Sequence, residues 1–269
     1  MMRSTMPVPA NRRRRFRLLG LFLIPCLLWA AWFHYGYRPI HRLQGPRLIY
    51  WAGERLEDLR FLNPQTEAVA FLASSVALLW DSVGVQPREQ PLYLPPGLQR
   101  IAVVRIDSHA DKPATLDAAQ LADTLRALVA AAHEPGTSAI QIDFDARTRE
   151  RAFYSKLLTE LRRQLGPAFP ISITAHASWC IDDRWIHDLP INEAVPLLFS
   201  MGSEEPLVRH YLNASDIFPE PLCRGSLGVS TGEWWSVPVH RHTRVYVFNP
   251  VTWTHEAVEN VRSHIHRGV

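Results

Sequence analysis

Residues 138–145 constrain the fold of this chain more than any other segment. Apolar residues occupy positions 140, 142 and 144, and polar residues occupy the positions between them: Gln141, Asp143 and Asp145. This two-residue period is typical of a β-strand. Helical patterns precede and follow the strand, which indicates a parallel sheet covered by helices. The two carboxylates lie about 6.6 Å apart along the strand, near its C-terminal end, where α/β barrels carry their chemistry.

Seven other segments have strand patterns, and several are separated by helical patterns. The predicted strands are 47–51, 68–72, 101–106, 171–176, 195–200, 225–231 and 244–249. The predicted helices are 118–132, 148–165 and 256–264, with one helical turn at 54–59 and a β-hairpin within 76–94. Eight strands predict a (β/α)8 TIM-type barrel, lean and partly irregular. A doubly wound open sheet is the alternative, but no glycine-rich phosphate loop follows the first strand.

The N-terminus has the pattern of a membrane anchor. Arginines crowd residues 12–17, and an apolar run with aromatic residues at its end covers 18–37, about the 20 residues that span a bilayer. The arginines predict a cytoplasmic tail over 1–17, which leaves a barrel domain at 45–269 outside the cytoplasm. A cleavable signal peptide is the alternative, although no small-x-small site follows the apolar run. Two lysines among many arginines indicate GC-rich bacterial coding, so we expect the bacterial inner membrane with the domain in the periplasm.

The remaining charge and the cysteines add two expectations. Six of the 29 basic residues lie in the first 17 positions, and the other 23 oppose 26 acidic residues, so nothing indicates a nucleic-acid partner. Cys180 and Cys223 are the only cysteines beyond the anchor. An oxidising compartment would permit a disulfide between them, closing a loop of about 43 residues. Two buried free thiols are the favoured interpretation.

In a barrel, Gln141, Asp143 and Asp145 would point inward, with Asp145 nearest the mouth. A lone buried charge is costly, so Asp143 requires a partner. A neutral or hydrogen-bonded Asp143 could orient the Asp145 side chain. This predicts Asp145 as a catalytic acid or base and Asp143 as its catalytic support. In the alternative, Asp145 caps the next helix and Asp143 pairs with an arginine such as Arg105.

A glycosidase needs a second acid on the other side of the scissile bond, at about 5.5 Å or 6.5–9.5 Å. Two carboxylates on one strand approach a sugar from the same side. The second acid would therefore follow another strand. The candidates are Glu54, Asp107, Glu204, Glu205 and Glu233.

Aromatic and polar residues near other strand ends predict a carbohydrate site. Trp179 follows His176 at the end of the fifth strand, where its indole would suit stacking on a sugar ring, and Trp51 lies near the end of the first strand. Asn249 could donate to a hydroxyl. In the alternatives, Trp179 packs over the barrel end and Asn249 holds a turn. Residues 107–111 (DSHAD) could be metal ligands, but a solvated loop is favoured, and we expect no metal and no cofactor.

Four segments together resemble a known family. In order along the chain, they are Arg105-Ile106, Ile142–Ala146, Ser172–Trp179 and Leu197–Gly202. They look like the bacterial domain of unknown function 3142, a family of exported, barrel-like proteins, over roughly residues 45–250. That family is similar in outline to the chitinase-like family 18 glycoside hydrolases, whose fourth strand carries Asp-x-Asp-x-Glu with the glutamate as acid.

The resemblance places Asp143 and Asp145 at the two aspartates and Arg147 at the glutamate. An arginine cannot donate a proton at neutral pH, so the family 18 mechanism as such is not available. The resemblance therefore implies a membrane-anchored barrel that acts on or binds envelope or extracellular polysaccharide, with another acid in place of the glutamate. The alternative is a non-catalytic glycan-binding or envelope-assembly protein on the same fold.

Overall fold

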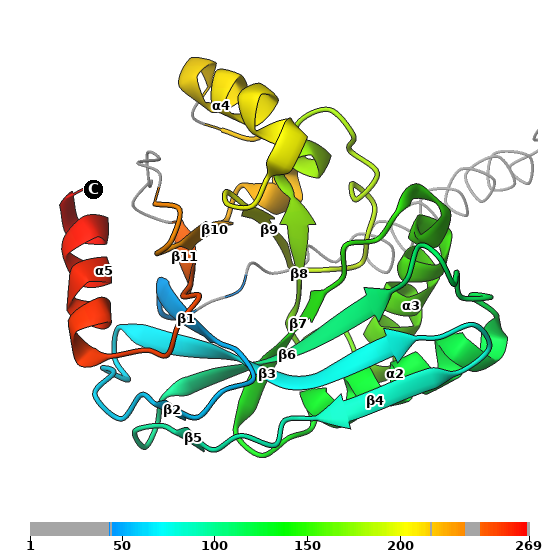
Figure 1. Cartoon of the computed structure of the whole chain (residues 1–269), viewed down its shortest axis with the longest axis horizontal. Helices are drawn as coiled ribbons and strands as arrows, with labels where there is room; N and C mark the ends of the chain where they lie inside the picture. The colour runs from blue at the N-terminus through cyan, green and yellow to red at the C-terminus, as the bar shows by residue number, and fades with distance from the viewer. Residues whose placement is uncertain (1–42, 44, 216, 235–242, 268–269) are drawn as a thin grey trace, which may run out of the picture. The chain divides into compact units, whose positions relative to one another are not determined.

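Eight parallel strands form a closed barrel in the computed structural model, which describes residues 43, 45–215, 217–234 and 243–267. The ring is closed because β1 pairs with both β3 and β11 (Figure 1). This confirms the parallel eight-stranded barrel. The strands, in order around the ring, are β1 (Leu48–Ala52), β11 (Arg244–Phe248), β10 (Ser226–Ser230), β9 (Glu193–Leu197), β8 (Ile171–His176), β7 (Thr137–Asp143), β6 (Gln99–Ser108) and β3 (Glu67–Leu78).

The described helices are fewer than the strands, as a lean barrel requires. They are α2 (Ala118–Ala132), α3 (Arg151–Leu165), α4 (Glu205–Ala214) and α5 (His255–Arg267). The first has the predicted bounds, and its N-cap is Asp117, whose side chain accepts from the backbone N–H of Gln120 at 2.9 Å. The predicted helix 148–165 begins with a 3-10 turn, Thr148–Glu150, before α3.

The predicted helical turn at 54–59 is wrong. Residues 57–58 form a short strand, β2 (Glu57–Asp58), which pairs with β5 (Leu92–Tyr93). The Glu57 side chain is buried and accepts from the backbone N–H of Trp253 at 2.9 Å. This contact with a distant segment outweighs the local preference of an acidic sequence for a helical turn.

One side of the barrel mouth extends beyond the rest. β3 has 12 residues and β6 has 10, whereas β9, β10 and β11 have 5 each. The end of β3 pairs in antiparallel fashion with β4 (Val83–Pro87), which confirms the predicted hairpin. Figure 1 shows this extension of β3, β4 and β6 lying over α2, which it contacts.

The alternation along β7 divides its side chains between two apolar layers. Ile140, Ile142 and Phe144 are at most 1% exposed and pack in the layer between barrel and helices. Small and branched residues fill the barrel interior below the mouth; they include Ile49, Ala68, Ala70, Ile101, Val103, Ala139 and Val195. The polar residues of β7 therefore face the interior, as predicted.

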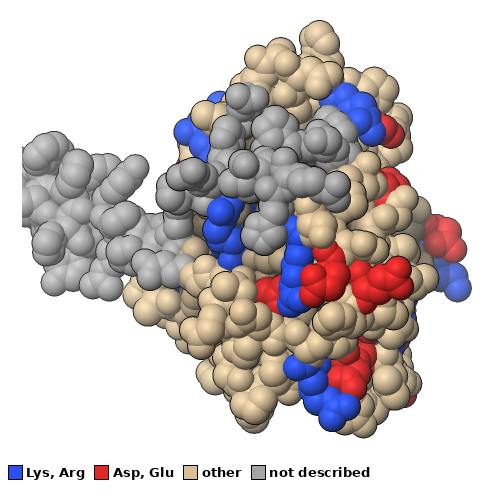
Figure 2. Space-filling model, turned by 90° about the vertical axis from the view of Figure 1, so that its left-hand side faces the viewer, with Lys and Arg blue, Asp and Glu red and all other residues tan. Residues whose placement is uncertain are grey.

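Figure 2 shows the side of the molecule on which α5 lies in Figure 1. Acidic and basic side chains lie next to one another on this face rather than in separate patches. Opposite charges are also paired at α5, where Arg262 contacts Glu67 and Glu259 at 2.6 Å each.

Cys180 and Cys223 form a disulfide, with their Cα atoms 5.9 Å apart, so the favoured interpretation of two free thiols is wrong. Two 3-10 turns, Ala177–Cys180 and Pro221–Cys223, bring the cysteines together. The backbone N–H of Glu220 donates to the carbonyl of Cys180 at 3.3 Å.

The predicted cytoplasmic tail (1–17) and transmembrane anchor (18–37) lie outside the described residues. Within the part of the chain that the structure describes, no helix is long and apolar enough to span a bilayer.

Candidate active site

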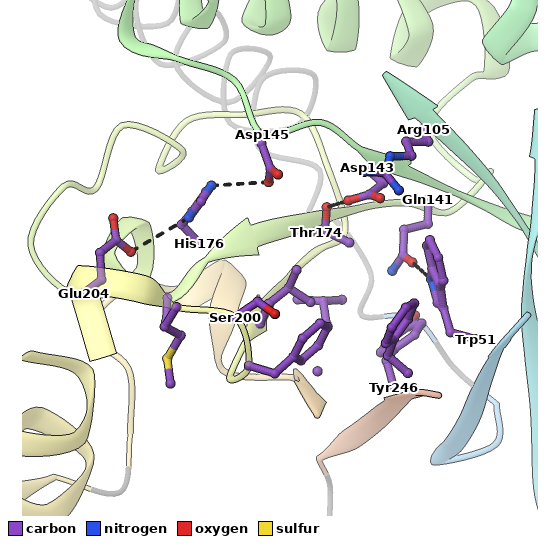
Figure 3. Close-up of a pocket in the computed structure, with 17 residues that line it drawn as sticks. Trp51, Arg105, Gln141, Asp143, Asp145, Thr174, His176, Ser200, Glu204 and Tyr246 are labelled. Carbon is purple, nitrogen blue, oxygen red and sulfur yellow. Dashed lines mark hydrogen bonds and ion pairs between the residues drawn. The ribbon is translucent and has the colours of Figure 1, made fainter. Parts of the chain in front are cut away.

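A cavity of about 260 Å³ opens at the C-terminal ends of the barrel strands (Figure 3). Polar and ionisable residues of β7, β8 and the segment after β9 form one side of it: Asp143, Asp145, Thr174, His176 and Glu204. Aromatic residues of β1, β11 and the segment after β9 form another: Trp51, Phe199, Tyr246 and Phe248. Because β7 and β11 lie on opposite sides of the eight-stranded ring, carboxylates face aromatic rings across the cavity.

His176 contacts two carboxylates. Its Nε2 lies 3.2 Å from Asp145 Oδ1, and its Nδ1 lies 3.9 Å from Glu204 Oε2 (Figure 3). The hydrogen bond to Asp145 raises the pKa of His176. The same bond lowers the pKa of Asp145, which is therefore held as a carboxylate. Asp145 contacts His176 and lines the cavity, and it does not cap the helix that follows it.

Asp143 has a different environment although it is only two residues away. Its Oδ1 accepts from the Thr174 hydroxyl at 2.7 Å, and it is paired in register with Arg105 of β6. Burial of the carboxyl raises the pKa of Asp143, and the nearby charge of Asp145 acts in the same direction. The pocket thus contains one aspartate with a raised pKa and one with a lowered pKa.

A chain of hydrogen bonds crosses the barrel interior below the carboxylates. Trp51 Nε1 donates to Gln141 Oε1 at 2.9 Å, and Gln141 Nε2 donates to the Ser172 hydroxyl at 3.2 Å. Ser172 and Tyr246 both donate to Glu193 Oε1, at 3.1 Å and 2.6 Å. These bonds fix Trp51 against β7 and Tyr246 against β9.

The structure brings together five of the seven predicted site residues, since Asp143, Asp145, Gln141, His176 and Trp51 all line the cavity. The acids and Gln141 come from β7 and its end, and His176 ends β8.

Trp179 and Asn249, the other two residues predicted to bind substrate, do not line this cavity. Trp179 is 4% exposed and packs edge-on against Trp185 with ring centres 5.0 Å apart, so it offers no free face to a sugar. Its ring also lies 5.0 Å from that of His176, which it supports from behind. Asn249 accepts from the Thr231 hydroxyl at 2.6 Å and holds a turn.

Of the five candidates for a second acid, Glu204 is the one that lines the cavity. The other four have different partners. Glu54 accepts from two backbone N–H groups of 89–90, Asp107 contacts Arg105, Glu205 contacts Arg209, and Glu233 accepts from Ser200. Asp145 and Glu204 contact the two different nitrogens of the same imidazole.

The lining residues that went unrecognised in the sequence include Thr174, Phe199, Tyr246 and Phe248. The two-residue alternation of residues 244–248 indicated that Tyr246 and Phe248 share one face of the strand, opposite to Val245 and Val247. No pattern in the sequence indicated that this face would meet the carboxylates.

Residues 107–111 do not form a metal centre. Among the residues that the structure describes, no group of three or more His, Cys, Asp or Glu side chains is placed to hold a metal ion. Asp107 instead contacts Arg105 at 3.2 Å.

One of the comparisons with known proteins agrees with the barrel fold. The model of a family described as a domain of unknown function (DUF3142) matches residues 96–188, which include β6, β7 and β8. A putative chitinase A from Streptomyces coelicolor has a similar structure, with 9% sequence identity and a TM-score of 0.52 over 82% of this chain and 99% of that chain. At this identity the likeness shows the fold alone. A comparison with curated proteins found no match.

The chitinase domain of the spore coat protein CotE from Clostridium difficile is 13% identical, over 56% of this chain and 49% of that one. This chain thus spans about half the length of that domain, and the TM-score of 0.39 is too low to indicate a shared fold. The chain is therefore similar to the domain of unknown function DUF3142 over its central strands and shares the barrel fold of a putative chitinase.

Proposed function

We propose that this chain hydrolyses glycosidic bonds in an envelope or extracellular polysaccharide. The observation that carries the proposal is the opposite direction of the pKa shifts of Asp143 and Asp145 within one cavity. Glycosidases need one carboxyl group that keeps its proton and one that is ionised, and different environments for two carboxyls are how enzymes assign these roles.

In this proposal Asp143 donates its proton to the oxygen of the scissile bond. Asp145, ionised through its bond with His176, stabilises the positive charge that develops on the sugar. Glu204, which follows another strand and lines the same cavity, activates the attacking water from the other side of the bond. The aromatic side of the cavity, with Tyr246 and Phe248, receives the sugar ring. A cavity of about 260 Å³ is slightly below the usual range for ligand sites, about 300–1,000 Å³, and suits one ring rather than a chain.

We also propose that the domain is exported and anchored in the bacterial inner membrane. The arginines and the apolar run of 12–37 support the anchor. The Cys180–Cys223 disulfide supports an oxidising compartment, because such bonds are rare in the cytosol.

Reducing-sugar release from envelope and extracellular glycans by the full chain in detergent tests the activity. We expect Asp143→Asn and Asp145→Asn each to lower the rate by about 10²-fold or more, as removal of a general acid or base does. Asp123→Asn is the matched control, since Asp123 is exposed on α2 and pairs with Arg126. If Asp143→Asn releases sugar as fast as the unmodified chain, the assignment is wrong.

One observation favours the alternative of glycan binding without cleavage. Arg147, at the place of the family 18 glutamate, does not line the cavity that holds His176 and the aromatic residues; it contacts Ser108 and Glu150 instead. Under this alternative, calorimetry would detect glycan binding that Asp143→Asn leaves intact, and the unmodified chain would release no reducing sugar.

A further inference from the structure

A second, smaller cavity of about 170 Å³ adjoins the first. Its lining comes from the C-terminal end of β6 and the segment after β7, and includes Arg105, Asp107, Ser108 and Arg147. Arg105, Asp143 and Asp145 line both cavities. The two candidate catalytic carboxyls therefore lie at the junction, and Figure 3 shows Arg105 beside Asp143 there.

The two cavities differ in their chemistry. Aromatic residues form much of the first, whereas charged and hydroxyl side chains form most of the second. A bond between a ring in the first cavity and a group in the second would lie over Asp143 and Asp145. The second cavity would then hold the sugar on the other side of the scissile bond. This inference rests on the proposed function.

With Asp143 holding its proton, as the proposed function requires, the charged groups around the second cavity include one guanidinium more than they have carboxylate partners. Asp107 contacts Arg105 at 3.2 Å. Glu150, which is fully buried, faces two guanidinium groups, those of Arg147 at 3.7 Å and Arg149 at 3.3 Å. One carboxylate cannot neutralise both. The Asp145 charge, for its part, is compensated by His176.

Arg147 is the group that can respond to a ligand. Its side chain is 44% exposed, and its hydrogen bond to the Ser108 carbonyl is long, at 3.4 Å. The shorter contact with Glu150 is made by the backbone, because the N–H of Arg147 donates to Glu150 Oε2 at 2.8 Å. The guanidinium can therefore turn toward the cavity without loss of the turn that positions it. A guanidinium presents paired N–H donors that match a carboxylate in a two-pronged contact.

We infer that the second cavity is a subsite for a sugar that carries a carboxylate, such as a uronic acid, and that Arg147 determines this specificity. The substrate is then an acidic polysaccharide. Arg147 binds the substituent, while Asp143 and Asp145 act at the adjoining bond.

The test compares uronic-acid oligosaccharides of several linkages with the same oligosaccharides after their carboxyl groups have been reduced to alcohols. Binding to the full chain in detergent is measured by calorimetry. Because Arg147 is partly exposed, we expect a preference for the acidic form of about five- to tenfold, declining with added salt. Arg147→Gln should remove this preference, and Arg147→Lys should restore part of it.

Arg126→Gln, on the exposed face of α2, is the matched control and should leave the preference unchanged. Unchanged affinity of Arg147→Gln for the reduced oligosaccharides would show that the variant is folded. Equal affinity for acidic and reduced forms would overturn this inference and leave the proposed function standing. Failure to bind either form, together with no release of sugar from any glycan, would overturn both.

Discussion

Removal of the Tyr246 hydroxyl tests the buried hydrogen-bond chain below the pocket. This hydroxyl donates to Glu193 at 2.6 Å and accepts from Arg244 Nη2 at 3.2 Å, and the three residues are 3–5% exposed. Nε and Nη1 of Arg244 have no partner within the described part of the chain. A hydrogen bond to a charged group contributes about 1.5–3 kcal/mol. We expect Tyr246→Phe to lower the free energy of unfolding by about 3 kcal/mol, the upper end of this range, because the substitution removes a hydrogen bond from two buried charged groups at once.

Urea unfolding of the full chain in detergent, followed by tryptophan fluorescence, measures this cost. The midpoint should fall while the dependence on urea stays the same, which indicates lost stability and not a changed unfolded state. Tyr93→Phe is the control, because Tyr93 is 47% exposed and far from the interior. A loss below about 1 kcal/mol would refute the reasoning, since a bond of this kind contributes more than that when buried.

Three further predictions concern the site and its support. The pKa of His176 is raised and that of Asp145 is lowered, so the pair stabilises the fold above the pH at which Asp145 is protonated, and this effect is lost as the pH rises through the raised pKa of His176. The stability lost in His176→Gln, measured by urea unfolding from pH 3 to 9, should therefore be largest between about pH 4 and 6.5. This loss should stay below about 1 kcal/mol, because both side chains are more than a third exposed. A constant difference across that range would contradict it. Replacement of Cys180 and Cys223 by serine opens a loop with a separation of 43 residues and should cost about 4 kcal/mol, measured in the same way. Asp117→Ala removes the N-cap of α2 and should cost about 1 kcal/mol, whereas Asp123→Ala, within the same helix, should cost less.

Local patterns were sufficient for much of the fold. The two-residue period of 140–145 predicted both the strand and the inward direction of Gln141 and Asp143, because successive side chains of a strand point to opposite faces. The acidic segment 54–59 was misjudged as a helical turn since the partner that buries Glu57, the backbone of Trp253, is distant in the sequence. A pattern within a segment contains no information about such a partner.

The sequence by itself indicated the eight strands and the positions of Asp143 and Asp145 on and after one of them, because each depends on residues a few positions apart. Only the tertiary structure decided that Glu204 reaches His176, that Trp179 is buried, and that Tyr246 faces the carboxylates. It also decided that Cys180 meets Cys223. The physical reason is closure of the ring. Pairing β1 with both β3 and β11 sets which strand ends face one another across the cavity.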